Sequence, residues 1–168
     1  NSCFRMALPE NARIDTFGRL IEKWAESFGL LGESENGLLA MALNFPKDDS
    51  SLKTGKGSDA TDALFAALDS SRILTVVRNG AFGAIGVNEF LVKKRFGGRM
   101  PSNPFTKAGV PVLITRNTRE RNLFNGDIGV TVEGPGGMTA IFARGKDVVT
   151  CPVDLLPEHD LAYAITVH

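Results

Sequence analysis

Three arginines and one asparagine lie in one short segment of the sequence, residues 115–121, which reads TRNTRER. Guanidinium groups and side-chain amides donate hydrogen bonds to phosphate and sugar oxygens, and such contacts hold a strand without reading its bases. Glu120 is the one acidic residue in the segment. We therefore predict a single-stranded DNA contact here, against the alternative of a solvated loop. The candidate residues are Arg116, Asn117, Arg119 and Arg121.

An aromatic ring and a turn sequence follow this segment. Phe124 is the aromatic residue that we expect to stack on a base, since the single Trp and most of the 11 Phe residues fit core stripes better. Residues 125–127 (Asn-Gly-Asp) have the composition of a tight hairpin turn, because Asn and Gly accept positive φ and Asp bonds the backbone. The turn is the favoured interpretation, and a DNA contact by Asn125 is the second one.

Arg78 directly follows residues 72–77 (RILTVV), a short β-branched run typical of a buried strand. Ligands of open α/β sheets bind at the carboxyl ends of strands, so Arg78 is a candidate for contact with a nucleotide phosphate. An ordinary surface arginine is the alternative. The glycines at positions 80, 83 and 86 are interpreted as turn residues with permissive backbone angles.

Motifs for catalysis are absent from the sequence. A phosphate loop reads G-x-x-x-x-G-K-[ST], and residues 55–58 (GKGS) fail that pattern because a glycine separates the lysine from the serine. There is no GxSxG elbow or HExxH zinc helix, and Cys3 and Cys151 form no CxxC pair. We therefore assign no catalytic residue and no metal site, and expect the chain alone to bind no cofactor and to be inactive.

The composition is that of a chain able to form a core, with 43% hydrophobic residues in a length of 168. Its 19 basic residues balance 19 acidic ones, so any DNA contact must be local rather than a property of bulk charge. No apolar run is close to the length of about 20 residues that a membrane-spanning helix needs. The N-terminus lacks the zones of a signal peptide. We expect a cytoplasmic protein without a membrane partner.

The periodicity predicts helices in the first half of the chain. Apolar residues recur every three or four positions over residues 12–31, and a shorter helix is expected over residues 35–44. The polar residues 47–58 predict an exposed loop or linker. A helix over residues 61–68, capped by Asp59 or Thr61, and a helix over residues 87–96 flank the strand at 72–77. This part is expected to be an α/β layer.

The second half predicts β structure after a connector rich in Pro and Gly at residues 97–109. Four short apolar runs separated by turns suggest a small barrel, and a last apolar run at residues 161–167 (LAYAITV) suggests a buried strand that returns to the first layer. The four runs are residues 110–115, 128–133, 138–143 and 147–151.

Three segments in this order resemble the RecD family, the alpha subunit of exodeoxyribonuclease V. They are RILTVVRNGAFGAIGVNEFL at residues 72–91, VPVLITRNTRERNLFNGDIGVTV at residues 110–132, and LLPEHDLAYAITVH at residues 155–168. The resemblance implies a superfamily 1 DNA helicase of recombinational DNA repair, which hydrolyses ATP with Mg²⁺ in a cleft between two RecA-like lobes. It also implies other exonuclease V subunits as partners.

On this resemblance, the chain is expected to be a fragment without the nucleotide-binding half, with Arg78 on the opposite side of the ATP cleft. Thr166 and His168 match the start of helicase motif V, which contacts single-stranded DNA. The implied division is a helical segment and linker at residues 1–58, part of the second RecA-like lobe at 59–109, an SH3-like β insert at 110–156, and the return strand of the lobe at 157–168.

A protein-interaction module without enzymatic activity is the competing hypothesis, in which the SH3-like part binds a partner protein. A groove for Pro-rich ligands is lined by aromatic residues. Residues 110–155 contain only Phe124 and Phe142 as aromatics. This hypothesis therefore ranks second.

Overall fold

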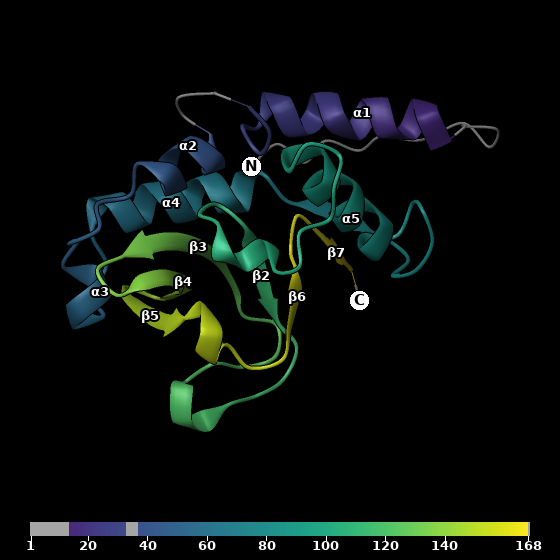
Figure 1. Ribbon diagram of the computed structural model, residues 1–168. Helices are drawn as coiled ribbons and strands as arrows, with labels where there is room; N and C mark the ends of the chain where they lie inside the picture. Colours follow the sequence, from purple (N-terminus) through teal and green to yellow (C-terminus); the bar gives the residue numbers. More distant parts are fainter. Residues whose placement is uncertain (1–13, 33–36, 168) are drawn as a thin grey trace.

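The computed structural model describes residues 14–32 and 37–167, which form a mixed α/β fold (Figure 1). None of the helices described there has the length and apolar character needed to cross a membrane. The helices are α1 (Ile14–Ser27), α2 (Leu38–Leu43), α3 (Ser51–Thr54), α4 (Asp59–Ser70) and α5 (Ala84–Arg95), with short 3₁₀ turns η1 (Pro104–Thr106), η2 (Arg119–Arg121) and η3 (Val153–Leu155). The strands are β1 (Ile73–Thr75), β2 (Pro111–Ile114), β3 (Ile128–Gly134), β4 (Gly137–Arg144), β5 (Asp147–Pro152), β6 (His159–Leu161) and β7 (Ala164–Thr166).

The strands form two sheets of opposite character. β1 and β7 pair in parallel, while five strands form an antiparallel sheet in the order β5-β4-β3-β2-β6. The four strands expected in the second half are thus confirmed as β2 to β5, and the two-residue turns after Gly134 and Arg144 make the hairpins. The expectation of a closed barrel is wrong for the described residues, because no pairing joins the edge strands β5 and β6.

Helices cover the two sheets from one side (Figure 1). α2 and α4 pack on β3, whereas α5 packs on β7 and α1 lies on α5. The buried face predicted for the first helix is partly confirmed, since Ile21 and Ala25 are buried. The helix was expected to reach residue 31, but α1 ends at Ser27. Residues 12–13 and 35–36 of the two expected N-terminal helices lie outside the described residues.

Residues 47–58 were expected to be an exposed loop or linker, and most of them are exposed, but they also form the short helix α3 and pair with the sheet. Their backbone packs on β5: Gly55 accepts a hydrogen bond from the Val148 N–H at 2.7 Å, and the Gly57 N–H donates to Lys146. Ser58, rather than Asp59 or Thr61, is the N-cap of α4 and forms a reciprocal capping box with Thr61. Polar composition is compatible with this packing because the backbone and hydroxyl groups find partners within the fold.

The first strand is shorter and more exposed than the run at residues 72–77 suggests. Pairing ends at Thr75, and Val76 is 86% exposed. Of the glycines that follow, only Gly80 has the permissive backbone angle that was predicted, with φ of 86°. Gly83 and Gly86 are required for close packing instead: a Cβ on Gly83 would collide with the Asn79 carbonyl, and one on Gly86 with the Gly80 carbonyl. This close packing lets α5 begin at Ala84, three residues before the predicted start.

The last apolar run does not form the single strand that was expected. β6 belongs to the antiparallel sheet and β7 to the parallel pair, with Ala162 and Tyr163 between them. The buried Asn88 side chain of α5 holds this switch, since its amide donates to the carbonyls of Leu161 and Ala164, both at 2.9 Å. Its oxygen accepts from the Ala164 N–H at 2.8 Å. An apolar run alone carries no sign of such a change of sheet.

Replacing Asn88 by leucine is expected to lower the free energy of unfolding by about 3 kcal/mol, because buried backbone groups at the switch lose their partners. Urea unfolding measures the difference. The exposed Asn79 is the matched control, and its replacement by leucine is expected to cost under about 0.5 kcal/mol. Equal losses for the two variants would show that the Asn88 contacts contribute no net stability.

Candidate functional site

A cavity of about 710 Å³ lies where α5, β7, β6 and the loop between β2 and β3 meet. Three of the predicted site residues line it: Arg78 after β1, Asn125 in the turn before β3, and Thr166 in β7. The fold thus brings together residues from the three sequence segments that carry the family resemblance. The predicted residue His168 lies outside the described residues.

Arg78 is exposed and forms an ion pair across the mouth of this cavity. Its Nη2 donates to Asp160 Oδ2 at 3.0 Å, with 64% and 50% of the two side chains exposed. The turn behind it is fixed to α5, because the N–H groups of Ala84 and Ile85 donate to the carbonyls of Val77 and Arg78. This contact uses one of the five N–H donors of the guanidinium, so a phosphate oxygen could bind Arg78 beside Asp160 or in its place.

The remaining predicted residues lie on the long loop between β2 and β3, which joins the cavity at Asn125. Asn117 and Asn125 contact each other, since the Asn125 N–H donates to Asn117 Oδ1 at 2.7 Å. The expected turn is confirmed: the Asp127 N–H donates to the Phe124 carbonyl, and Gly126 has φ of 94°. It leads from the loop into β3 instead of closing a hairpin.

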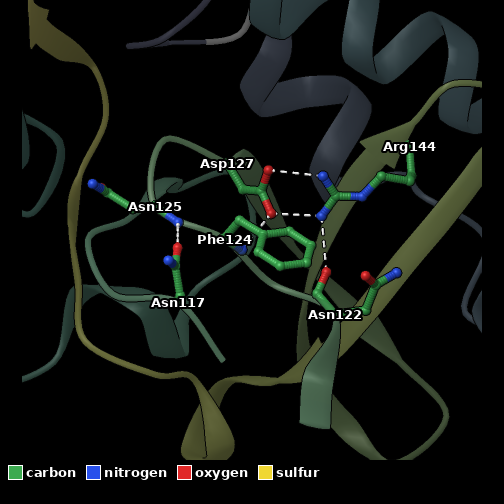
Figure 2. A network of polar contacts seen from close by, with 6 residues as sticks. All are labelled: Asn117, Asn122, Phe124, Asn125, Asp127 and Arg144. Atoms are coloured by element: carbon green, nitrogen blue, oxygen red, sulfur yellow. Dashed lines mark hydrogen bonds and ion pairs between the residues drawn. The ribbon is translucent and has the colours of Figure 1, made fainter. Parts of the chain in front are cut away.

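One ion pair anchors this loop to the sheet (Figure 2). Arg144 of β4 donates from Nη1 to Asp127 Oδ1 at 2.9 Å and from Nη2 to Oδ2 at 2.5 Å. The same Nη2 reaches the carbonyl of Asn122, which has a left-handed backbone with φ of 54°. Asp127 also accepts the Phe124 N–H at 2.8 Å. The conformation of the loop therefore depends on a residue of β4 that the sequence patterns did not single out.

The electrostatics of this pair follow from its contacts. Burial alone would raise the pKa of the Asp127 carboxyl, but hydrogen bonds from Arg144 and the Phe124 N–H, with the charge of Arg144, lower it below its ordinary value. The hydrogen bond to Asp127 likewise raises the pKa of Arg144, against its burial. Both groups thus carry their charge throughout the neutral range.

Phe124 presents an aromatic surface beside this pair. The Arg144 guanidinium carbon lies 5.3 Å from the ring centroid, and the side chain is 39% exposed. A cation held against the ring fixes its orientation. The exposed part of the ring is available for stacking.

The predicted arginines of the loop differ in their surroundings. Arg116 and Arg119 are exposed, whereas Arg121 is half-buried. Burial raises the pKa of the Cys151 thiol, and the charge and hydrogen bond of Arg121 act in the opposite direction. Arg121 is therefore directed at β5, and the exposed positive charge of the loop comes from Arg116 and Arg119.

Sequence reasoning missed three residues of this region: Asn88, Arg144 and Asp160. Each acts through a partner 17 to 82 positions away, as in the pairs Arg144–Asp127 and Arg78–Asp160. A single sequence carries no signal for such pairs. Only the resemblance of residues 72–91 to the RecD family pointed to the region of Asn88.

No family model matches the sequence. Comparison with curated proteins finds similarity to the proteins called "RecBCD enzyme subunit RecD". That of Mycobacterium tuberculosis is 30% identical over 113 residues, which cover 65% of this chain and 19% of the relative. That of Mycolicibacterium smegmatis is 33% identical over 113 residues, 66% of this chain and 19% of the relative. That of Haemophilus influenzae is 26% identical over 131 residues, 75% of this chain. The chain thus spans about a fifth of the length of these relatives.

Proposed function

We propose that the chain forms part of the second RecA-like lobe of an ATP-dependent DNA helicase subunit of the RecD family, the family to which its similarities point. In this role it supplies contacts to single-stranded DNA and one side of the ATP cleft. The observation that carries the proposal is the cavity that joins Arg78, Asn125 and Thr166. Exonuclease V is the proposed assembly, in the cytoplasm, with its other subunits as partners.

The proposed domain division places the lobe at residues 59–109 and 157–168, and the SH3-like insert at residues 110–156. It is supported by the parallel pairing of β1 with β7, because the connection between them contains α5 and the whole run β2 to β5. A parallel pair with a helix packed on it is typical of α/β layers. β6 joins the insert to the lobe by pairing with β2.

ATP and Mg²⁺ would be held mainly by residues of the other lobe, since this chain has no phosphate loop. ATP hydrolysis would supply the free energy for closing and reopening the lobes. Arg78 is the residue of this chain that fits contact with the nucleotide, because it is exposed and its carboxylate partner can be exchanged for a phosphate oxygen. Thr166 lies at the same cavity, where motif V would couple the nucleotide to the strand.

The strand would cross the loop between β2 and β3. Arg116 and Arg119 are exposed and suited to phosphate oxygens, and Phe124 is suited to stacking on a base. Asn117 and Asn125 contact each other, and Asn125 also lines the cavity, so the proposed path continues from the loop to the cavity. The alternative role as an SH3-like interaction module has less support, because Phe142 is buried and Phe124 is the exposed aromatic side chain of β2 to β5.

Titration of an unstructured single strand onto the chain at several salt concentrations tests this proposal. Replacing Arg116 and Arg119 by glutamine is expected to weaken binding and to reduce the slope of log K against log salt by about 1.4, the effect of two lost phosphate contacts. The control replaces Lys53 and Lys146, two exposed lysines of α3 and the β4–β5 turn, by glutamine. Binding without any dependence on salt, or equal effects of both double variants, would contradict the proposed path.

A further inference from the structure

The charged groups that line the cavity are a poor match for phosphate. Arg78 is the one guanidinium among the described lining residues, which also include two carboxylates, Glu89 and Asp160. Asp160 already pairs with Arg78. Glu89 pairs with Lys93 in the next turn of α5, with 3.6 Å between Glu89 Oε2 and Lys93 Nζ. A phosphate inside the cavity would therefore meet more negative than positive groups, and its desolvation would be uncompensated.

The walls of the cavity suit a flat apolar ligand with polar edges. Phe105, Leu113, Ile128 and Ile165 supply apolar surface, and Asn125 and Thr166 supply an amide and a hydroxyl. The volume of about 710 Å³ lies within the usual range of small-ligand sites. His159 is fixed at the wall, because its Nδ1 lies 2.6 Å from the Pro157 carbonyl and its ring packs edge-on against Phe105.

The carboxylates also restrict which ligand fits. A carboxylate accepts hydrogen bonds and donates none, so Glu89 and Asp160 favour a ligand that presents N–H groups at its edge. Adenine, cytosine and guanine carry an exocyclic amino group with two N–H donors, whereas the Watson–Crick edge of thymine offers only the single N3–H donor. The geometry therefore distinguishes between bases as well as between base and phosphate.

We infer that this cavity binds a single nucleobase with an exocyclic amino group, turned out of the stack of the strand, while the phosphates stay on the loop outside. The part that concerns the strand rests on the proposed function. Asn125 connects the two sites: its backbone is held by Asn117, and its side chain extends away from the Asp127–Arg144 pair (Figure 2). A base next to the one on Phe124 thus lies at the mouth of the cavity.

Uncharged nucleosides separate base binding from strand binding. Adenosine and cytidine at millimolar concentration are expected to shift the methyl NMR signals of Leu113, Ile128 and Ile165, with thymidine several-fold weaker and inorganic phosphate without effect. Ile85 lines the cavity from α5 and is 41% exposed, so Ile85→Trp fills the mouth without removing a polar group. Val76→Trp is the matched control on an exposed residue outside the cavity, and it is expected to leave the shifts intact.

A strand with one abasic position, moved along its length, supplies the second readout. One position is expected to weaken binding about fivefold or more, and Ile85→Trp is expected to remove this difference while the salt dependence stays. Salt-dependent strand binding with no nucleoside shifts, or cavity shifts with phosphate, would overturn the inference and leave the proposed function. Nucleoside shifts without strand binding would overturn the proposed function alone, and absence of both would overturn both.

Discussion

Replacing Arg78 by alanine is expected to lower ATP turnover by the complete helicase subunit about 100-fold or more, at saturating DNA. A positive group aimed at the transferring phosphoryl group stabilises charge that develops only in the transition state. Arg78 follows β1 and is exposed at the cavity mouth, where its partner Asp160 is itself half exposed. Single-strand binding by the variant is expected to change little, because Arg78 lies off the loop for which the phosphate contacts are proposed.

Two control variants separate this role from that of a structural ion pair. Asp160→Asn removes the partner and leaves Arg78 in place, so turnover is expected to persist. Arg99→Ala removes an exposed arginine of the connector before η1 and is expected to have no effect. Equal losses for Arg78→Ala and Asp160→Asn would mean that the pair matters only for the fold, and unchanged turnover in Arg78→Ala would reject the phosphate role.

Breaking the Asp127–Arg144 pair is expected to cost about 2 kcal/mol of stability and about tenfold in single-strand affinity. Breaking a fully buried ion pair costs more stability than this, and breaking an exposed pair costs almost none. This pair lies between the two cases, since the Asp127 side chain is 16% exposed and that of Arg144 is 34% exposed. Asp127→Asn removes the charge while Asn keeps the size of the side chain. Affinity falls because the pair holds Phe124 and the Asn122 carbonyl in the loop.

An exposed ion pair of the same sheet is the matched control. Lys56 and Asp147 lie 2.7 Å apart with 74% and 53% of their side chains exposed, so Asp147→Asn is expected to cost under about 0.5 kcal/mol. Urea unfolding and strand titration measure both variants. A loss in Asp127→Asn no larger than in Asp147→Asn would show that the pair does not organise the loop.

Because of the same ion pair, the free energy of unfolding is expected to fall at acid pH. The folded pKa of Asp127 lies below its ordinary value of 3.8, so its contribution is fully present above that value and is lost as the pH falls through the folded pKa. Asp127→Asn is expected to flatten this part of the profile, as measured by urea unfolding between pH 2 and about 6. An unchanged profile would mean that Asp127 has the same pKa in both states.

Local patterns predicted the parts of the fold that depend on local interactions. The strands β2 to β5 and the turn at Gly126 follow from short apolar runs and turn residues, and the helices α1, α2, α4 and α5 from their period. The switch between β6 and β7 could not be predicted in this way. An apolar run has the same composition whether it enters one sheet or two, and the switch is held by Asn88, more than 70 positions away.

The candidate site shows the same division. Residues 116–125 were singled out because their side chains have the chemistry of nucleic-acid contacts, but their partners are distant in sequence. The ring of Phe124 is oriented by Arg144, and Arg78 is paired with Asp160. The packing of residues 47–58 on β5 depends on backbone hydrogen bonds, which carry no trace in residue type.

Photocrosslinking with a single strand that carries 5-iodouracil at successive positions tests the central claim most directly, because it maps contacts without any substitution in the protein. Mass spectrometry of the linked peptides locates them. Crosslinks within residues 115–127, with Phe124 foremost, and within residues 159–167 at the cavity are the predicted result. Crosslinks confined to α1 to α4, or none under conditions in which the strand is bound, would contradict the proposed DNA path.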